Sequence, residues 1–586
     1  MQRYFKGRFI PFLAAITLLL SVVAGSFAFV SQYHVFASGA HQNTSRGNLT
    51  GTGKAVAASL VSTHSIDMAS VPAETPTALT HRPTSLPLHT GVSATVYAQR
   101  KAAAAHNKNA PTGHHIYSSL TTGAYTPAAK TSFAGMADSA SICGCQPPDM
   151  ALAASKSYVL QGVNTSFAVY SSSGTIQSGW PKSAKSFFGV PNPGSCSPSG
   201  PFLSDPRAFY DPNDKRFWAA ILEVEGAFGV NNCPFVSRYW IGVSSTSDPR
   251  GTWHIFAYDM AIGTTNGADY THFGFDGQAI YFSGNMFDQS GSFYQYAQIL
   301  SVKKSTLEGG SGATAYGFRF LSFGGVTVDT VQPVEVEAYN YGGPRGGLFI
   351  SSFNGNGDPF GDDCFSTACH GYVIWSIANP GTSSAALSSA ITSGSTYLDA
   401  PNADEPGCLG CIETLDTRIS GTPVYHDGMI SFALETNVYN GSQNVPAILW
   451  GQVVPSLNDN GSIASASVFQ NGYYVYGGDN AASFGALMPD ADGNLFMVFE
   501  FMSRTTNPEV AYTARRATYT LGLFHDGGFI LKVGASPTFD SRWGDYEATS
   551  YDGVSTNNVW FSGQYSASNG DWATQIGKDV FSLSTP

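Results

Sequence analysis

Short apolar runs recur along this chain at a nearly regular interval. Each run is rich in aromatic and β-branched residues, and each follows an acidic residue, a few alternating positions and a turn. Successive runs begin 59, 63, 68, 82, 65 and 64 residues apart. They begin at Tyr158, Phe217, Ile280, Leu348, Ile430, Leu495 and Val559. A repeat of this length, with several short strands per unit, is typical of a β-propeller. The pattern predicts an all-β fold with a seven-bladed β-propeller over residues 126–586, and six blades are the alternative.

The last repeat is one strand short. We expect strands at 547–551, 559–564 and 572–581, and the sequence then leaves no room for a fourth before Pro586. An unfinished blade would expose an unpaired strand edge. We therefore expect a strand from before Asp149, within 124–133, to complete the last blade.

The first 125 residues have a different composition. Arg3, Lys6 and Arg8 precede an apolar stretch, and small residues at 35 and 37 suit a cleavage site. Residues 1–37 thus predict an export signal or, because the stretch is long enough to span a bilayer, an N-terminal membrane anchor. Residues 38–125 are rich in Ala, Ser, Thr, His and Pro without a sustained apolar period, which predicts a disordered low-complexity linker with solvated histidines. Both alternatives place the propeller outside the cytosol, secreted or tethered to the membrane.

The charge is distributed unevenly. Residues 1–140 carry ten Lys or Arg and three Asp or Glu, whereas the remainder carries 19 and 38, within a net charge of −12. An acidic propeller cannot neutralise a phosphate backbone, so we expect no nucleic-acid partner. Membrane contact is expected only through an N-terminal anchor.

An acidic residue recurs at the start of the innermost strand of each predicted blade. The recurring positions are Asp149, Asp205, Asp269, Glu335 or Glu337, Asp416, Asp479 and Asp545. The loops that enter these strands open on one face of a propeller, together with the loops between second and third strands. We expect these side chains to meet at the mouth of the central channel. The same segments supply candidate ligand-binding residues, namely Arg207, Tyr270, Arg418, Arg542, Trp543 and Tyr546.

Three interpretations of this ring of carboxylates remain open. Grouped carboxylates with divergent pKa values suit an acid and base pair for glycoside chemistry, with candidates Asp205, Asp269, Asp416 and Asp545. Hard oxygen ligands would instead suit calcium, with candidates Asp149, Asp205 and Asp545. Alternatively, each Asp caps a turn of its own blade. The stretch from Asp490 to Asn494 resembles the start of a calcium loop, but it falls on a hairpin and is interpreted as a turn.

The chain has an even number of cysteines, which in an exported protein predicts disulfide bonds. All of them fall in loops of the face that carries the acidic residues. Cys196 and Cys233 are expected to pair, and Cys364 and Cys369 to close locally. Zinc held by the CxC and CxxC pairs is the alternative. The eight residues are Cys143, Cys145, Cys196, Cys233, Cys364, Cys369, Cys408 and Cys411.

Two sets of motifs resemble known propellers. The segment Thr246-Ser-Asp248-Pro-Arg-Gly251-Thr-Trp253 is similar to the Asp-box of sialidase-type propellers, with its glycine displaced by one position. In that family the box is structural. Residues 141–583 resemble a family of secreted bacterial propellers of unassigned activity through Pro147-Pro-Asp149, Ser204-Asp-Pro-Arg207, Ala268-Asp-Tyr270, Leu415-Asp-Thr-Arg418 and Ser541-Arg-Trp-Gly-Asp-Tyr546. Sialidases use an arginine triad, so the resemblance implies a triad of Arg207, Arg418 and Arg542, although no Arg-Ile-Pro motif accompanies it.

These observations favour a secreted or cell-surface propeller that binds an extracellular ligand, a carbohydrate or a protein, at its disulfide-braced face. A glycoside hydrolase, a sialidase-like enzyme or a lyase that uses the carboxylates of the mouth is the alternative. A structural surface protein without a ligand is the third hypothesis. The sequence names no cofactor beyond the calcium considered above.

Overall fold

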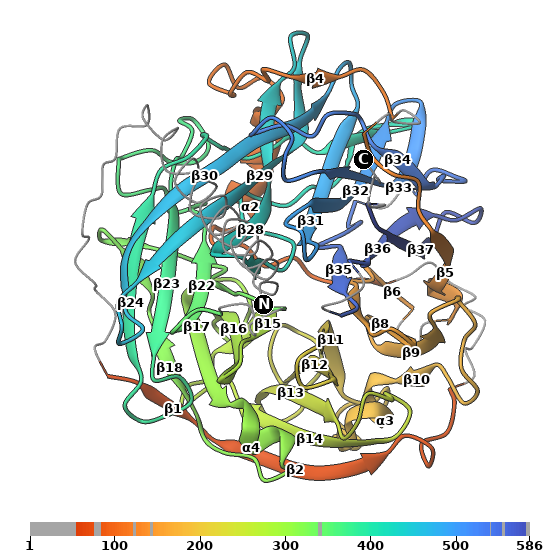
Figure 1. The fold of residues 1–586 in the computed structure, drawn as a ribbon, viewed down its shortest axis with the longest axis vertical. Helices are drawn as coiled ribbons and strands as arrows, with labels where there is room; N and C mark the ends of the chain where they lie inside the picture. Colours follow the sequence, from red (N-terminus) through yellow and green to blue (C-terminus); the bar gives the residue numbers. More distant parts are fainter. Residues whose placement is uncertain are drawn as a thin grey trace, which may run out of the picture. The chain divides into compact units, whose positions relative to one another are not determined.

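Each of the seven apolar runs forms the second strand of an antiparallel sheet, and seven such sheets form the blades of a β-propeller (Figure 1). The computed structural model describes residues 54–74, 84–120, 125–140, 144–337, 343–538, 541–553 and 557–581. The second strands are β8 (Tyr158–Val163), β12 (Arg216–Glu225), β16 (Ala279–Phe287), β22 (Gly347–Ser351), β28 (Met429–Tyr439), β32 (Leu495–Ser503) and β36 (Val559–Ser566). The prediction of an all-β, seven-bladed propeller is confirmed.

The first strand of each blade lies innermost and contacts the first strands of neighbouring blades. These strands are β7 (Ala151–Ala154), β11 (Phe202–Asp211), β15 (Gly267–Phe275), β21 (Gln332–Pro333), β27 (Val424–His426), β31 (Ala481–Pro489) and β35 (Ala548–Tyr551). The third strands are β9 (Ser166–Ser171), β13 (Val236–Ser244), β17 (Tyr294–Lys303), β23 (Tyr372–Ala378), β29 (Asn444–Leu457), β33 (Thr506–Arg515) and β37 (Trp572–Asp579). The fourth strands of the first six blades are β10 (Lys182–Ser183), β14 (Thr252–Asp259), β18 (Ala315–Arg319), β24 (Ala386–Thr392), β30 (Ile463–Tyr476) and β34 (Phe529–Lys532).

The core lies between the blades. Strand β16 is buried along its whole length, because each face of its sheet packs against a neighbouring blade. Aromatic side chains fill these interfaces, and Trp218, Trp375 and Trp560 are among those that are fully buried. Burying one large apolar side chain stabilises a fold by about 1.5–3 kcal/mol. The recurring aromatic runs are therefore the residues that hold the blades together.

A strand from before the first blade completes the seventh. Strand β5 (Thr131–Ala137) pairs antiparallel with β37, so the seventh blade has the order β35-β36-β37-β5. Met136 is buried, and Phe133 lies 6.3 Å from Trp560 between ring centroids. The closing strand was expected within 124–133; it begins inside that range and runs four residues further.

The segment that precedes β5 is also part of the propeller. Strand β1 (Val56–Ala58) pairs with β18, β2 (Leu60–Asp67) with β14, and β4 (Ile116–Tyr117) with β30 (Figure 1). Strands β1, β2 and β4 of the described part of 38–125 are thus ordered edge strands, where the sequence predicted a disordered linker. Alternate residues of β2 are exposed, because the strand covers an open sheet edge through backbone hydrogen bonds. Backbone pairing needs no apolar period, so the composition gave no sign of it.

Short elements occupy the loops. The helices are α2 (Ala94–Ala104), α3 (Ala184–Phe188) and α4 (Lys304–Glu308), with a 3-10 turn at Asp138–Ala140. Small sheets pair β3 (Thr84–Ser85) with β6 (Cys145–Gln146), β19 (Ser322–Phe323) with β20 (Val326–Thr327), and β25 (Ala403–Glu405) with β26 (Cys408–Ile412). None of the helices in the described part of the chain has the length and apolarity needed to cross a membrane. The predicted export signal or anchor, residues 1–37, lies outside the described residues.

Candidate functional site at the mouth of the propeller

One face of the propeller collects the loops that enter the first strands and the loops that join second to third strands. We call it the mouth face. It carries the disulfides Cys196–Cys233, Cys364–Cys369 and Cys408–Cys411, together with Cys145, which is also disulfide-bonded. Cys143 lies outside the described residues. The expected pairings are confirmed, and because a disulfide sulfur is not a thiolate, the alternative of zinc held by the cysteine pairs is wrong.

The innermost strands share a backbone irregularity at the mouth. In six blades a residue other than glycine adopts a positive φ near the start of the first strand, and at three of these positions the register shifts against the second strand. The residues and angles are Asp149 (49°), Asp205 (55°), Tyr270 (50°), Thr330 (47°), Leu415 (59°) and Phe484 (58°). Such a bulge redirects a side chain away from the sheet. Here it turns side chains at the strand entrance toward the mouth.

A small cavity lies among these strand entrances, with a volume of about 20 Å³. Its polar lining comes from five blades. The lining residues are Leu86, Pro87, Leu88, His89, Asp149, Phe202, Ser204, Asp205, Phe228, Asp269, Tyr270, Arg418, Arg542 and Asp545. A volume of this size holds about one water molecule. We call this space the mouth cavity.

Three of its carboxylates are fixed by neighbours. Asp205 accepts a hydrogen bond from the Thr271 backbone N–H at 2.8 Å, and Asp149 accepts one from the Asn164 side chain at 2.7 Å. Oδ1 of Asp149 is buried and accepts no hydrogen bond from any described residue. Asp269 lies 3.2 Å from Nδ1 of His89. A buried carboxylate oxygen without a donor indicates a position where a ligand or water could bind.

The surroundings separate the pKa values of these carboxyl groups. Burial, together with the nearby charges of Asp545 and Asp205, raises the pKa of Asp149 well above its usual range. Burial and the charge of Asp269 raise the pKa of Asp205 to about 7. Burial alone would also raise the pKa of Asp269, but His89 and the arginines outweigh it and hold the pKa below its usual value. The cavity therefore holds a carboxyl that retains its proton beside one that stays ionised, as an acid and base pair requires.

The three candidate arginines are held in different ways. Arg418 forms a two-pronged pair with Asp416 at 2.8 and 2.9 Å, and Arg542 donates to both oxygens of Asp545. Arg207 lies instead behind the cavity, with its guanidinium 3.4 Å from the Tyr546 ring centroid. Only two of the three line the cavity, and both are neutralised by aspartates. The arrangement does not bring a free triad to one point.

A segment from near the N-terminus covers the cavity. Residues Leu86–His89 line it directly, and the His89 carbonyl accepts a hydrogen bond from Arg418 at 3.4 Å. The His89 ring is tilted against the Phe228 ring, with the ring centroids 4.7 Å apart. Helix α2 follows. We call Leu86–His89 and α2 together the cover.

Helix α2 is anchored by buried polar contacts. Nζ of Lys101 donates to Thr414 Oγ1 at 2.6 Å and to the Leu415 carbonyl at 2.8 Å, and lies 3.7 Å from Glu413. The Tyr97 hydroxyl donates to the same Glu413 carboxylate. The cover is thus held by specific bonds to the segment that leads into the fifth blade.

The structure brings together most of the predicted mouth residues, namely Asp149, Asp205, Asp269, Tyr270, Arg418, Arg542 and Asp545. Asp416 lies just behind, as the partner of Arg418. Trp543 and Tyr546 are fully buried in the core, where Trp543 donates to Glu500 at 2.5 Å. Asp479 lies outside the cavity and accepts a hydrogen bond from the Arg504 backbone N–H at 3.0 Å.

Sequence reasoning missed two groups. Asp329 precedes the left-handed Thr330 in the fourth blade as Asp269 precedes Tyr270 in the third, so it holds the position that was assigned to Glu335 or Glu337. His89 was interpreted as a solvated histidine of a linker. Its position directly after the apolar Leu86-Pro-Leu88 is the signal that could have identified it.

The calcium hypothesis is weakened by the cavity lining. A calcium site needs six to eight oxygen ligands. The guanidinium groups of Arg418 and Arg542 line the same small space, and their positive charge opposes a cation there. The stretch after Asp490 forms a turn in which the Asp490 carboxylate accepts the backbone N–H groups of Asp492 and Asn494 at 3.0 and 2.9 Å.

Exposed apolar side chains surround the mouth. Phe293, Phe360 and Tyr439 lie on loops between second and third strands or at the strand end, and are 65%, 45% and 40% exposed. Leu409, in the loop closed by Cys408–Cys411, is 68% exposed. Single exposed apolar side chains are common on protein surfaces, so we consider these four as candidate ligand contacts only because they lie in the loops of the mouth face.

Comparisons with known proteins give only distant matches. No protein-family model matches the chain, and no curated protein matches it. Among solved structures, it is similar to an arabinanase of Bacillus subtilis, with 13% identity, 62% of this chain and 93% of that chain covered, and a TM-score of 0.25. It is also similar to a Trypanosoma rangeli sialidase in complex with the inhibitor DANA, with 9% identity, 60% and 52% covered, and a TM-score of 0.29. A third is a protein of unknown function from Dyadobacter fermentans, with 10% identity, 64% and 94% covered, and a TM-score of 0.28. At these values the similarities support no functional argument.

Proposed function

We propose that this protein is a secreted or cell-surface β-propeller that binds an extracellular glycan at the mouth face. The observation that carries the proposal is the convergence of carboxylates, guanidinium groups and a phenol from five blades on the mouth cavity. Carboxyl, guanidinium and phenol groups supply the hydrogen-bond donors and acceptors that ligand hydroxyl groups require. The disulfides support a location outside the cytosol, because such bonds persist in oxidising surroundings.

The rim supports the same function. Phe293 and Tyr439 present aromatic rings to solvent near the covered mouth, and aromatic rings stack on the apolar faces of sugars. The disulfides Cys196–Cys233, Cys364–Cys369 and Cys408–Cys411 restrict the motion of the nearby loops. Rigid loops lower the entropy cost of binding.

In this proposal the cover regulates access. The mouth cavity holds about one water molecule, so a sugar ring can reach Asp149 and Asp205 only after Leu86–His89 moves away. A ligand that binds only the uncovered state has an apparent affinity reduced by the fraction of molecules in that state. The cover thus sets the affinity, and because His89 pairs with Asp269, its opening also changes the electrostatics of the site.

The proposal is tested by applying the purified full chain to a glycan array and to a panel of extracellular proteins. We expect a defined subset of glycans to bind, and Phe293→Ala to weaken that binding while the matched control Phe469→Ala, on the outer strand β30, leaves it unchanged. Binding to proteins alone, or to nothing, would overturn the proposal of a glycan ligand.

A glycosidase is the second candidate function, and the separated pKa values of Asp205 and Asp269 favour it. In this hypothesis the protonated Asp205 is the general acid and the ionised Asp269 the base or nucleophile. Incubation with polysaccharides and sialosides should then release products that Asp205→Asn and Asp269→Asn abolish. Binding without product release would leave the protein a binding module.

A further inference from the structure

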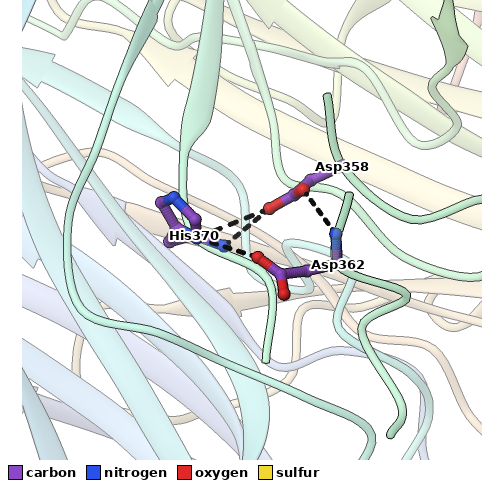
Figure 2. A group of neighbouring side chains, drawn as sticks. All are labelled: Asp358, Asp362 and His370. Carbon is purple, nitrogen blue, oxygen red and sulfur yellow. Dashed lines mark hydrogen bonds and ion pairs between the residues drawn. The ribbon is translucent and has the colours of Figure 1, made fainter. Parts of the chain in front are cut away.

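A second group of side chains, away from the mouth cavity, has the composition of a metal site. Asp358, Asp362 and His370 lie in the loop between β22 and β23 of the fourth blade. Each offers one ligand atom, and these atoms all lie within 4.8 Å of one another. Figure 2 shows both carboxylates pointing toward His370.

The spacing of these atoms fits metal ligands better than it fits a direct hydrogen bond. Nδ1 of His370 lies 3.6 Å from the Asp358 carboxylate and 3.4 Å from that of Asp362, and it makes no hydrogen bond with any described residue. A charge-assisted hydrogen bond would be about 2.7–2.9 Å long. Two ligands about 2.1 Å from a tetrahedral zinc ion are separated by about 3.4 Å. The histidine nitrogen is therefore at the distance that two ligands of one ion keep from each other.

The surrounding loop fixes the ligands before an ion arrives. The Asp358 carboxylate is fully buried and accepts hydrogen bonds from the backbone N–H groups of Phe360, Asp362 and His370 at 2.9, 3.1 and 3.1 Å. The disulfide Cys364–Cys369 closes the chain between Asp362 and His370, with the two Cα atoms 4.6 Å apart. Such outer contacts orient ligands and strengthen metal binding.

We propose that Asp358, Asp362 and His370 bind one divalent transition-metal ion, for which zinc is the probe of choice. An imidazole nitrogen beside two carboxylates suits zinc and its neighbours, whereas calcium and magnesium take oxygen ligands alone. The Asp362 and His370 side chains are 27% and 32% exposed, so an ion can enter from solvent and keep a water ligand. Three protein ligands and one open position are the set found in zinc sites that bind further groups.

The site has a mechanical consequence for the cover. The same loop receives Arg100 of α2, which donates to the Gly355 carbonyl at 3.2 Å, and Asn109 beyond it, which donates to the Ser366 carbonyl at 2.7 Å. The Arg100 guanidinium also lies 5.4 Å from the Phe365 ring centroid. A bound ion stiffens the loop on which the helix rests, so it should slow the opening of the cover.

The test measures the zinc affinity of the full chain. The protein is first freed of metal with a chelator and is then titrated with zinc in competition with a chromogenic chelator. The chain has 13 histidines, so weak binding elsewhere is expected and the variants decide the result. We expect the wild type to bind one equivalent of zinc tightly. His370→Gln and Asp362→Asn should weaken this affinity at least tenfold. His106→Gln, which changes an exposed histidine outside the loop, should leave it unchanged. Both site residues are partly exposed, so these variants should fold, which thermal melts without metal verify.

Two further readings distinguish a site from a loop that is merely structural. Cobalt in place of zinc should give visible absorption bands in the wild type and not in His370→Gln. Zinc should raise the melting temperature of the wild type and not of His370→Gln. Equal zinc affinity in the wild type and in both site variants would overturn the proposal, as would a zinc-dependent melting temperature that His370→Gln leaves unchanged.

Discussion

Lys101 is the residue whose loss should loosen the cover most. Its ammonium group is buried, with a side chain 5% exposed, and it supplies hydrogen bonds to Thr414 and Leu415 as well as a positive charge near Glu413. Lys101→Met keeps the apolar stem and removes all of these interactions. The Glu413 carboxylate, 10% exposed, would then remain in place without a nearby ammonium group.

The size of the effect follows from this burial. Removing one partner of a buried ion pair costs about 3–5 kcal/mol, mostly because the remaining charge stays desolvated. Here only one contact is a close charge pair, at 3.7 Å, so we expect the lower end, about 3 kcal/mol. Since about 1.4 kcal/mol is a factor of ten in an equilibrium, the open population of α2 should rise about 100-fold.

Amide hydrogen exchange measures this opening residue by residue. Protection of Ala94–Ala104 should fall about 100-fold in Lys101→Met, while protection of strands such as β16 stays unchanged. Lys108→Met, which removes an exposed lysine just beyond the helix, is the matched control. Lys101→Met/Glu413→Gln also removes the carboxylate that pairs with Lys101, so at least half of the lost protection should return.

Unchanged protection of α2 in Lys101→Met would refute the reasoning. The same conclusion would follow if Lys108→Met had an equal effect, because the loss would then reflect charge on the surface and not the buried contact.

Three further predictions concern the mouth and the loops around it. Burial and Arg542 lower the pKa of His89, but the charges of Asp269 and Asp205 outweigh them, so the pKa is raised. The protonated His89 therefore stabilises the fold fully below the unfolded pKa of about 6.5, and this stabilisation is lost as the pH rises through the raised pKa. The depressed pKa of Asp269 gives a stabilising contribution that is complete above about pH 3.9 and is lost in acid. Exchange protection of Leu86–His89 should therefore be greatest between about pH 4 and pH 6.5. His89→Gln should remove the decrease in protection at high pH. Asp205, with a pKa raised to about 7 by burial and Asp269, destabilises the fold once ionised, so Asp205→Asn should raise the unfolding free energy by about 2–4 kcal/mol at pH 8 and leave it nearly unchanged at pH 4; an equal effect in denaturant melts at both values would contradict this account. Replacing Cys196 and Cys233 by serine opens a loop with a sequence separation of 37 and should cost about 4 kcal/mol, against about 2 kcal/mol for Cys364 and Cys369 with a separation of 5; similar losses for both pairs would contradict the loop-length explanation.

The sequence predicted those features that depend on repetition. Apolar runs such as Phe217–Ala220 recur because every blade buries its second strand between neighbours, and the acidic residues recur because every first strand enters at the same face. Asp149, Asp205, Asp269 and Asp545 could thus be assigned to one cavity from spacing alone. The closing strand β5 could be inferred because an open edge is unfavourable.

The remaining features depend on contacts that leave no periodic trace. Strand β2 holds its edge position through backbone bonds, so its polar residues resembled a linker. The register at the mouth varies by a residue between blades, since Asp205 itself adopts the left-handed conformation whereas Asp269 precedes the residue that does. Counting residues back from the second strand therefore selected Asp479 in the sixth blade and overlooked Asp329 in the fourth.

The central claim is that the mouth beneath the cover is the ligand site. The most direct measurement is the dissociation constant of a glycan selected on the array, determined by calorimetry for the wild type, Lys101→Met and Lys108→Met. If the cover competes with the ligand, Lys101→Met should bind at least tenfold more tightly, and Lys108→Met should match the wild type. Equal or weaker binding by Lys101→Met would show that the glycan does not need the space under the cover, and would contradict the claim.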